Sequence, residues 1–445
     1  MRPAKDTIAA IATPPGRGGV GIVRVSGSDA GRIASAIVRD RPPPRQARLR
    51  DFCDAAGSVI DQGLVLWMPG PDSFTGEDVF ELHGHGGMIV TDLVLQRVLE
   101  LGARAAEPGE FLQRAFLNDQ LDLAQAEAIA DLIDSGSAEA ARAATRALRG
   151  ELSTAVIELQ QSLTELRIYT EAAIDFPEEE IDFLADAELH QRLHALRQQV
   201  TGLLVMTRQG VLLQAGMTVV IAGAPNAGKS SLLNRLAGYA AAIVTAIPGT
   251  TRDVLRERLS LDGLPLHVID TAGLRDTGDA VEREGVRRAQ AEMAQADRVL
   301  LVVDGHSGEL PRCNWPAGIP VTLVINKTDL GPPVAVEPAV AVDTTIMISA
   351  ETGAGLDELR DHLKSCMGYA GGESNAIMAR RRHIDAIQRA HTHIESGAEQ
   401  LATAAAGELL AEELRLAQRS LGEITGEFSS DDLLGEIFSS FCIGK

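Results

Sequence analysis

The sequence predicts a multidomain fold, with an α+β N-terminal domain, an all-α central domain and an α/β P-loop domain inserted into the helical one. Three observations predict it. Roughly the first 115 residues alternate strand-like and turn-like runs. Helical patterning continues on both sides of residues 214–372. A glycine-rich loop at 223–230 lies between an apolar run and a leucine-spaced helix. A chain of 445 residues has room for two to three domains.

The predicted elements follow in chain order. Apolar runs and periodicity in the N-terminal part predict strands over 8–13, 21–25, 64–67 and 78–82, and a helix over 89–101. Strongly helical sequence begins at about Leu121, breaks at 175–180 and continues to about Leu213. It returns after Gly371 and Gly372 and runs to about Leu421. We therefore expect domains over 1–118, 119–213, 214–372 and 373–445, with the second and fourth segments forming one helical domain.

The charge of the chain bears on its partners. Its 41 Lys and Arg against 62 Asp and Glu give a formal net charge of −21. Such an acidic chain does not hold nucleic acid through a general positive field, so contact with RNA would need a local basic cluster or a basic partner. The candidate clusters are Arg380–His383 and the set Arg142, Arg146 and Arg149. The alternative for both clusters is an ordinary solvated helix face.

The expected compartment is the cytoplasm, without a membrane anchor. No apolar stretch approaches the roughly 18 residues of a membrane span, and the N-terminus lacks a signal-peptide pattern. The cysteines, Cys53, Cys313, Cys366 and Cys442, are scattered, which fits reduced thiols rather than a disulfide framework.

Gly223–Ser230 reads Gly-Ala-Pro-Asn-Ala-Gly-Lys-Ser, the spacing of a phosphate-binding loop. Glycines let the backbone approach a polyphosphate closely, so that successive N–H groups point at its oxygens. Lys229 is expected to reach the β- and γ-phosphates, and Ser230 to hold Mg²⁺. The strand-like run before the loop and the helical run after it meet the context that this motif requires.

Three further motifs predict that the nucleotide is GTP and that the α/β domain is a Ras-like G domain. Asn326–Asp329 resembles the guanine-reading motif, whose aspartate accepts two hydrogen bonds that adenine cannot offer. Ser349–Glu351 resembles the supporting loop, whose Ala350 N–H would contact the guanine oxygen. Asp270–Gly273 resembles the γ-phosphate motif, and Thr250 and Thr251 offer a switch threonine for Mg²⁺. The expected GTP-binding residues are Asn226, Ala227, Gly228, Lys229, Ser230, Ser231, Thr245, Ala246, Ile247, Pro248, Gly249, Thr250, Thr251, Asp270, Thr271, Ala272, Gly273, Asn326, Lys327, Asp329, Ser349, Ala350 and Glu351.

Two positions are unusual for a GTPase. Leu274 stands where Ras-like proteins carry the glutamine that orients the attacking water, and a leucine cannot do this. Asn226 lies inside the phosphate loop, where its side-chain oxygen could coordinate a monovalent cation; the alternative is that it only stabilises the turn. Glu282 could orient water directly or through a second water, or could be a solvated carboxylate near a helix start.

The chain resembles the MnmE (TrmE) family of tRNA-modifying GTPases over nearly its whole length. The most specific parts lie outside the G domain: Asp6–Thr13, Arg114–Asn118 and the tail from Leu421 to Phe428 and from Phe441 to Lys445. The resemblance implies modification of the wobble uridine, U34, at C5 in certain tRNAs. It implies a homodimer, a flavoprotein partner (MnmG/GidA) in a heterotetramer, and a tetrahydrofolate derivative as one-carbon donor.

The resemblance also implies residue roles. Hydrolysis would be stimulated by K⁺ held at Asn226, Thr245, Ile247 and Thr250, with Mg²⁺ at Ser230 and Thr251. Glu282, which would orient water, and Lys229 would be catalytic residues. The folate site would be formed by Arg24, Glu81, Gln120 and Lys445, where Gln120 stands in place of the familiar lysine and so lacks its charge. Cys442 is a candidate catalytic thiol, although a thiol between apolar residues is more often buried and inert.

Two alternatives stay open at this point. His83-Gly-His85 has residue types that ligate metals, but no third ligand is evident. A ribosome-assembly GTPase similar to Era or EngA would share an Asn in the phosphate loop and an apolar residue after Gly273. Such a protein is expected to carry a basic RNA-binding module, which the charge of −21 argues against.

Overall fold

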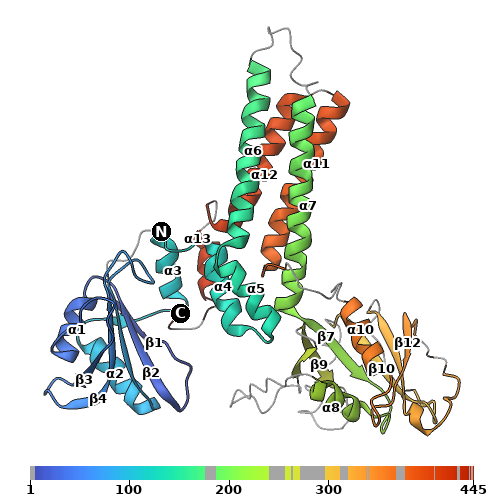
Figure 1. The fold of residues 1–445 in the computed structure, drawn as a ribbon, viewed down its shortest axis with the longest axis horizontal. Coiled ribbons are helices and arrows are strands. Elements are labelled where there is room, and N and C mark those ends of the chain that lie inside the picture. The colour runs from blue at the N-terminus through green and yellow to red at the C-terminus, as the bar shows by residue number, and fades with distance from the viewer. Residues whose placement is uncertain are drawn as a thin grey trace.

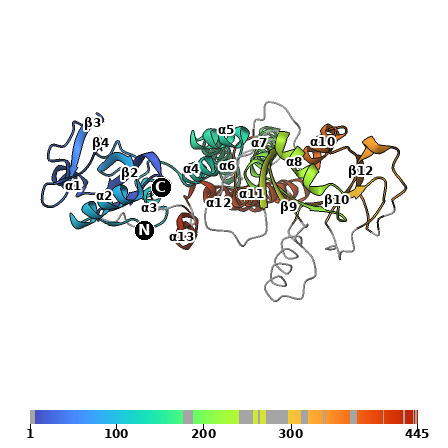
Figure 2. The same cartoon turned by 90° about the horizontal axis from the view of Figure 1, so that it is seen from below.

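The computed structural model describes residues 6–175, 187–239, 256–261, 264–270, 296–310, 319–336, 338, 340–366, 376–404, 406–427, 431–439, 441 and 444. Two sheets lie at opposite ends of the molecule with long helices between them (Figure 1). The view from below shows the same order of parts (Figure 2). The predicted multidomain fold is confirmed, because an α+β part, an all-α part and an α/β part are all present.

The N-terminal sheet has the strand order β3-β4-β5-β2-β1-β6. Its neighbours are antiparallel, except that β1 and β6 are parallel. The helices α1 (Ala30–Val38) and α2 (Met88–Glu100) pack on one face, and α3 (Glu110–Leu117) follows β6. The strands are β1 (Ile8–Ile11), β2 (Gly18–Ser26), β3 (Arg48–Cys53), β4 (Val59–Met68), β5 (Val79–Gly86) and β6 (Arg104–Ala105).

Side-chain alternation gives this sheet two different faces. Val23 and Val25 point into the core beneath α1 and α2, so Arg24 between them points to the opposite face. In β5, Phe80 and Leu82 join the same core, and Glu81 lies on the Arg24 face. Since Arg24 and Glu81 are register partners in the β2–β5 ladder, their side chains are neighbours.

The helical part combines two distant segments of the chain. The long helices α6, α7, α11 and α12 lie side by side, and α4 and α5 pack at their lower end (Figure 1). Asp122 starts α4 with a capping box, because its carboxylate accepts from Gln125 N and Gln125 reaches back to Asp122 N. The bounds are α4 (Leu123–Asp134), α5 (Ala138–Leu148), α6 (Glu151–Asp175), α7 (Ala187–Ala215), α11 (Arg381–Ala404), α12 (Gly407–Thr425) and α13 (Asp431–Ser439).

Two arginines of the basic cluster at Arg380–His383 form ion pairs with carboxylates of α4 instead of a solvated helix face. Arg382 Nε and Nη2 donate to the two oxygens of Glu127 at 2.8 and 2.7 Å, and Arg380 Nη2 donates to Asp131 Oδ1 at 2.9 Å. The expectation of a solvated helix face was wrong for these two arginines, because their carboxylate partners lie on α4, about 250 residues earlier in the sequence. Contact between this cluster and RNA stays a prediction. In the second cluster, Arg146 donates to Ala376 O and is likewise structural.

The second sheet has the order β12-β11-β10-β7-β9-β8 and is parallel except for β8. Buried apolar runs make up its central strands, as expected for a sheet covered on both faces. The carboxyl ends of its parallel strands meet at one edge, where loops can form a site. The elements are β7 (Met217–Ala222), α8 (Lys229–Tyr239), β8 (Arg256–Leu261), β9 (Leu264–Asp270), β10 (Arg298–Asp304), β11 (Val321–Asn326), η3 (Thr328–Leu330), β12 (Thr344–Met347) and α10 (Leu356–Cys366).

Candidate functional site

The phosphate loop connects β7 to α8 at the carboxyl edge of the second sheet. Gly228 has φ +94°, and a Cβ on it would lie 2.1 Å from Asn326 Nδ2, so a side chain there would push the loop off its support. A Cβ on Gly223 would lie 2.2 Å from Val302 O on β10. Both glycines are therefore required by close approach, which explains the motif spacing in this chain.

Lys229 lies at the first position of α8, beneath the loop. Its Nζ donates to Gly223 O and Ala224 O, each at 2.9 Å. An ammonium has three N–H donors, so one remains to meet a phosphate oxygen while the other two hold the loop closed. Ser230 and Ser231 follow on the exposed side of the helix start, where a helix dipole favours anions.

Asn326 links three parts of the site. Its Nδ2 donates to Ala227 O in the phosphate loop at 2.9 Å, and its Oδ1 accepts from Ala350 N at 2.9 Å. The side chain is 2% exposed, so these bonds are shielded from water. The first residue of the predicted guanine-reading motif thus ties the phosphate loop to the Ser349–Glu351 loop.

The guanine-motif loop that follows Asn326 is held by its own ion pair. Lys327 has φ +66° and its Nζ lies 2.6 Å from Asp304 Oδ2 at the end of β10. The hydrogen bond from Lys327 holds the pKa of Asp304 below its ordinary value. Asp329 is exposed in η3, just beyond the end of β11.

The Ser349–Glu351 loop is held from two sides. Ser349 is fully buried, and its Oγ accepts from Thr352 N at 3.0 Å. The Ala350 N–H predicted to contact guanine donates here to Asn326 Oδ1, so contact with a base requires this N–H to be shared or exchanged. Arg235, which the sequence did not single out, donates from α8 to Ala350 O and Glu351 O.

The remaining predicted GTPase positions lie outside the described residues, apart from Asp270. Asp270 ends β9, which runs parallel to β7, so its backbone lies at the same edge as the phosphate loop. The positions outside are Thr245, Ala246, Ile247, Pro248, Gly249, Thr250, Thr251, Thr271, Ala272, Gly273, Leu274 and Glu282.

A second polar site lies on the face of the N-terminal sheet that is turned away from α1 and α2. Arg24 Nε donates to Glu81 Oε1 at 2.8 Å, and His83 Nε2 lies 2.9 Å from Glu81 Oε2. Burial alone would raise the pKa of Glu81, but the hydrogen bond from His83 and the charge of Arg24 outweigh it and lower the pKa. The Arg24 guanidinium also lies over the rings of Phe74 and Phe111, 5.0 and 5.7 Å from their centroids.

The C-terminal tail reaches this second site. Arg24 Nη1 donates to Gly444 O at 3.4 Å, across 420 positions of sequence. Gly444 has φ +93°, and a Cβ on it would lie 2.4 Å from Ile11 O, so only glycine fits against β1. Phe441 is anchored in a cluster with Phe438, whose ring it meets edge-on at 5.7 Å. Its neighbours Cys442 and Lys445 lie outside the described residues.

Gln120 contacts the loop that adjoins this site. Its Nε2 donates to Asn118 O at 3.2 Å, and the side chain packs near Gly76 in the loop that carries Phe74. The structure therefore brings Arg24, Glu81 and the tail into direct contact, with Gln120 next to the adjoining loop.

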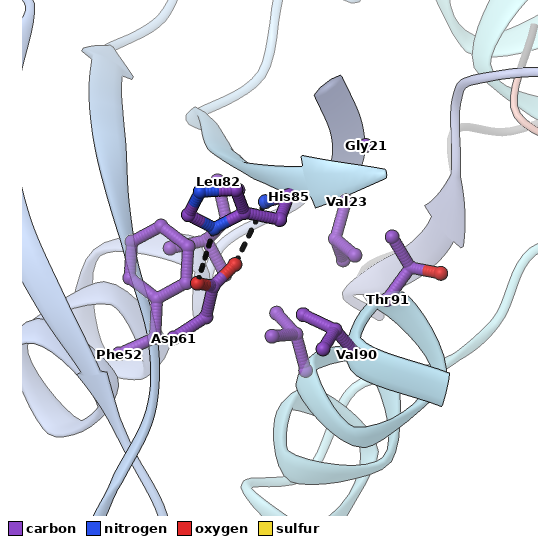
Figure 3. Close-up of a pocket in the computed structure, with 10 residues that line it drawn as sticks. Gly21, Val23, Phe52, Asp61, Leu82, His85, Val90 and Thr91 are labelled. Atoms are coloured by element: carbon purple, nitrogen blue, oxygen red, sulfur yellow. Dashed lines mark hydrogen bonds and ion pairs between the residues drawn. The ribbon is translucent and has the colours of Figure 1, made fainter. Parts of the chain in front are cut away.

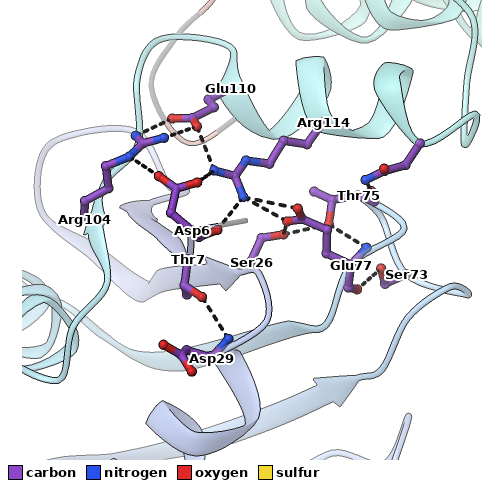
Figure 4. A network of polar contacts seen from close by, with 11 residues as sticks. Asp6, Thr7, Ser26, Asp29, Ser73, Thr75, Glu77, Arg104, Glu110 and Arg114 are labelled. Atoms are coloured by element: carbon purple, nitrogen blue, oxygen red, sulfur yellow. Dashed lines mark hydrogen bonds and ion pairs between the residues drawn. The ribbon is translucent and has the colours of Figure 1, made fainter. Parts of the chain in front are cut away.

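An ionic network centred on the buried Arg114 supports that loop (Figure 4). Arg114, with a side chain 3% exposed, donates to Asp6 Oδ1 at 2.8 Å, to Glu110 Oε1 at 2.9 Å and to both oxygens of Glu77 at 3.2 Å. Arg104 completes it through Asp6 and Glu110. Since Glu77 ends the loop that presents Phe74 to Arg24, the network fixes one wall of the site. This explains why Asp6–Thr13 and Arg114–Asn118 belong to one structural unit.

The two histidines predicted as a possible metal pair bind different carboxylates. His83 contacts Glu81, whereas His85 Nδ1 lies 2.7 Å from Asp61 Oδ1 beside a small cavity under α2 (Figure 3). That cavity measures about 10 Å³, room for one water at most. Within the described ranges, no group of three or more His, Cys, Asp or Glu side chains is placed to hold a metal.

The parallel sheet, the phosphate loop between β7 and α8, and the Asn326–Asp329 motif define the inserted domain as a P-loop domain of the GTPase class. Comparison with known proteins then identifies the family. Residues 7–120 match the family model for the GTP-binding protein TrmE N-terminus, and residues 123–442 match the model for the MnmE helical domain.

Full-length relatives agree with these matches. The chain is 59% identical over 451 residues to the tRNA modification GTPase MnmE of Sodalis glossinidius (strain morsitans), covering 99% of each chain. It is 59% identical over 455 residues to the protein of the same name from Stutzerimonas stutzeri (strain A1501), covering 100% of each. The chain therefore belongs to the MnmE family, and the resemblance inferred from the sequence is confirmed. None of the helices in the described part of the chain has the length and apolar character to cross a membrane.

Proposed function

We propose that this chain is a GTP hydrolase that acts in tRNA modification. The observation that carries the proposal is the convergence of the phosphate loop, Asn326 and the Ser349–Glu351 loop at one sheet edge, in a chain of the MnmE family. Lys229 and the loop N–H groups bind the phosphates, Ser230 and Thr251 hold Mg²⁺, and Asp329 selects guanine.

The proposal includes activation by K⁺. Asn226 is exposed at the crest of the phosphate loop with φ +62°, and its side chain forms no hydrogen bond with another described residue. An amide oxygen in this position is a suitable ligand for a hard monovalent cation, which would supply positive charge near the transferred phosphoryl group. Thr245, Ile247 and Thr250 complete the cation site, and Glu282 orients the attacking water that Leu274 cannot.

The Arg24 face of the N-terminal sheet is proposed to bind a tetrahydrofolate derivative as one-carbon donor. Arg24 uses one of its five donors on Glu81, and Glu81 retains acceptor capacity beyond its contacts with Arg24 and His83. This donor set suits an acceptor-rich glutamate tail and a pterin amino edge. Gln120 and Lys445 would extend the site, and Cys442 is the candidate thiol beside it.

The proposed reaction adds an aminomethyl-type group at C5 of the wobble uridine of certain tRNAs in the cytoplasm. It requires a homodimer and a flavoprotein partner (MnmG/GidA) in a heterotetramer. The domain boundaries at 1–118, 119–213, 214–372 and 373–445 are part of the same proposal. A ribosome-assembly GTPase of the Era or EngA type is the alternative; such a protein is expected to carry a basic RNA-binding module, which the net charge of −21 argues against.

Nucleoside analysis of tRNA from a deletion strain tests the proposal. Loss of the U34 modification, restored by this chain, is expected; unchanged U34 in the deletion strain would remove the proposed function.

In the purified protein, replacing K⁺ by Na⁺ should lower GTP turnover, and equal rates would remove the cation site. Glu282→Ala should bind GTP without hydrolysing it. A folate titration should show binding that Arg24→Ala weakens.

A further inference from the structure

Arg235 lies on α8, six residues after Lys229, and reaches across to the loop that follows β12. Its Nε donates to Ala350 O at 2.9 Å, and its Nη2 donates to Glu351 O. A guanidinium presents its donors in a rigid fork, so one side chain can hold two successive carbonyl groups in a fixed orientation. The two hydrogen bonds join Arg235 to residues that lie 115 and 116 positions later in the sequence.

The same loop is held on its other side by Asn326. Ala350 therefore has its N–H bound to Asn326 Oδ1 and its carbonyl bound to Arg235. Asn326 and Arg235 are both connected to the phosphate loop. Asn326 also binds Ala227 O in that loop, and Arg235 is part of the helix that begins at Lys229. The position of the Ser349–Glu351 loop is thus set relative to the phosphate loop.

We propose that Arg235 is a positioning residue that sets the base-contacting loop for guanine nucleotides. The proposal rests on the proposed GTPase function and names a residue that none of the GTPase motifs contains. When the 6-oxygen of the base competes with Asn326 for the Ala350 N–H, Arg235 keeps the carbonyl side of the loop in place. Binding geometry depends on placement within about 0.5 Å, so a loop held on one side only would bind the base less tightly.

If Arg235 only stabilised the fold, its removal would lower the melting temperature instead of changing the KM for GTP. The proposed role predicts the reverse. Arg235 is exposed, and exposed substitutions outside special sites usually change stability by less than about 0.5 kcal/mol. Arg235→Ala should therefore leave the melting temperature nearly unchanged, and should raise the KM for GTP about five- to tenfold with kcat within about twofold. Arg235→Lys keeps the charge but not the fork, so its KM should lie between those of the wild type and the alanine variant.

Steady-state GTP turnover by the full chain tests the proposal, with Asn234→Ala as the control because Asn234 is the exposed neighbour on the same helix. Inosine triphosphate is the second probe. Hypoxanthine keeps the 6-oxygen, so Arg235→Ala should raise both KM values by the same factor, whereas Asp329→Asn should reduce the preference for GTP. Unchanged KM, or a fall in kcat together with a lower melting temperature, would overturn the role of Arg235. A wild-type chain without GTP turnover would instead overturn the proposed function.

Discussion

Glu127 is the buried carboxylate on which the junction of α4, α11 and α12 depends, and replacing it by glutamine gives a measurable pH signature. Its side chain is 1% exposed. Arg382 donates to both of its oxygens, and Arg382 Nη1 also donates to Glu423 O at the end of α12. Burial alone would raise the pKa of Glu127, but His383 and Arg382 together lower it to about 2.

The contribution of Glu127 to the folding free energy, and its dependence on pH, both follow from the lowered pKa. A fall from 4.5 to about 2 corresponds to about 3 kcal/mol of folding free energy. Because the folded-state pKa is depressed, this contribution is present above the unfolded pKa and is lost as the pH falls towards 2. By about pH 3, roughly 2 of those 3 kcal/mol are gone. Glu127→Gln should therefore be less stable than the wild type by about 3 kcal/mol at pH 7 and by about 1 kcal/mol at pH 3.

Urea denaturation followed by far-UV circular dichroism measures this difference, since the helical domain dominates that signal. The control is Glu412→Gln, which removes an exposed carboxylate paired with Arg415 on the same helix. The control should match the wild type at both pH values, because exposed ion pairs contribute little. A difference between wild type and Glu127→Gln that is equal at pH 7 and pH 3 would refute an ionised Glu127 as the source of the stability.

Three other changes have expected outcomes. Asn326→Ala removes the bonds to Ala227 O and Ala350 N, so GDP affinity measured by calorimetry should fall at least about tenfold; unchanged affinity would show that the loops hold without it. Phe441→Ala should destabilise the chain by about 3 kcal/mol and speed proteolysis of the tail, whereas Phe441→Leu should cost less. Arg114→Ala leaves three carboxylates without their shared cation and should lower the melting temperature sharply, with Arg114→Lys intermediate.

Local motifs were predictable from the sequence because their chemistry depends on short spacing. The phosphate loop needs only Gly223–Ser230, with a strand before it and a helix after it, and both flanking elements are present. Elements with weak patterns were missed. Arg48–Cys53 alternates poorly and was not predicted as β3, and α13 follows a glycine and serine-rich break that concealed its helical period.

Most of the other contacts that the sequence did not predict join residues far apart in the chain. Arg380 and Arg382 were interpreted as a surface cluster because nothing near them in sequence indicates Glu127. Arg235 carries no motif, and its partners lie more than a hundred residues away. Asp6 and Arg114 were noticed only as parts of family-specific segments, whereas the structure makes them members of one network. Charge alone does not predict which carboxylate an arginine meets once the chain has folded.

The position of the C-terminal tail depends on two arginines from distant parts of the chain. The Arg380 guanidinium lies 5.6 Å from the centroid of the Phe441 ring, and Arg24 binds Gly444 O. Arg380 directly follows the buried segment Ala376–Ala379, which comes after the G domain in sequence. This segment is held tightly, because a Cβ on Gly210 of α7 would lie 1.8 Å from Ile377 O.

This arrangement places Arg380 between the buried segment Ala376–Ala379 and the ring of Phe441 in the tail. A displacement of the G domain that pulled on Ala376–Ala379 would act on Arg380, whose ion pairs with Asp131 and Glu127 resist movement. Movement of Arg380 would remove the cation that lies over the ring of Phe441, four residues before the end of the tail. Because Gly444 fits against β1 only through close backbone approach, a displaced tail would also take the Gly444 carbonyl away from Arg24 Nη1.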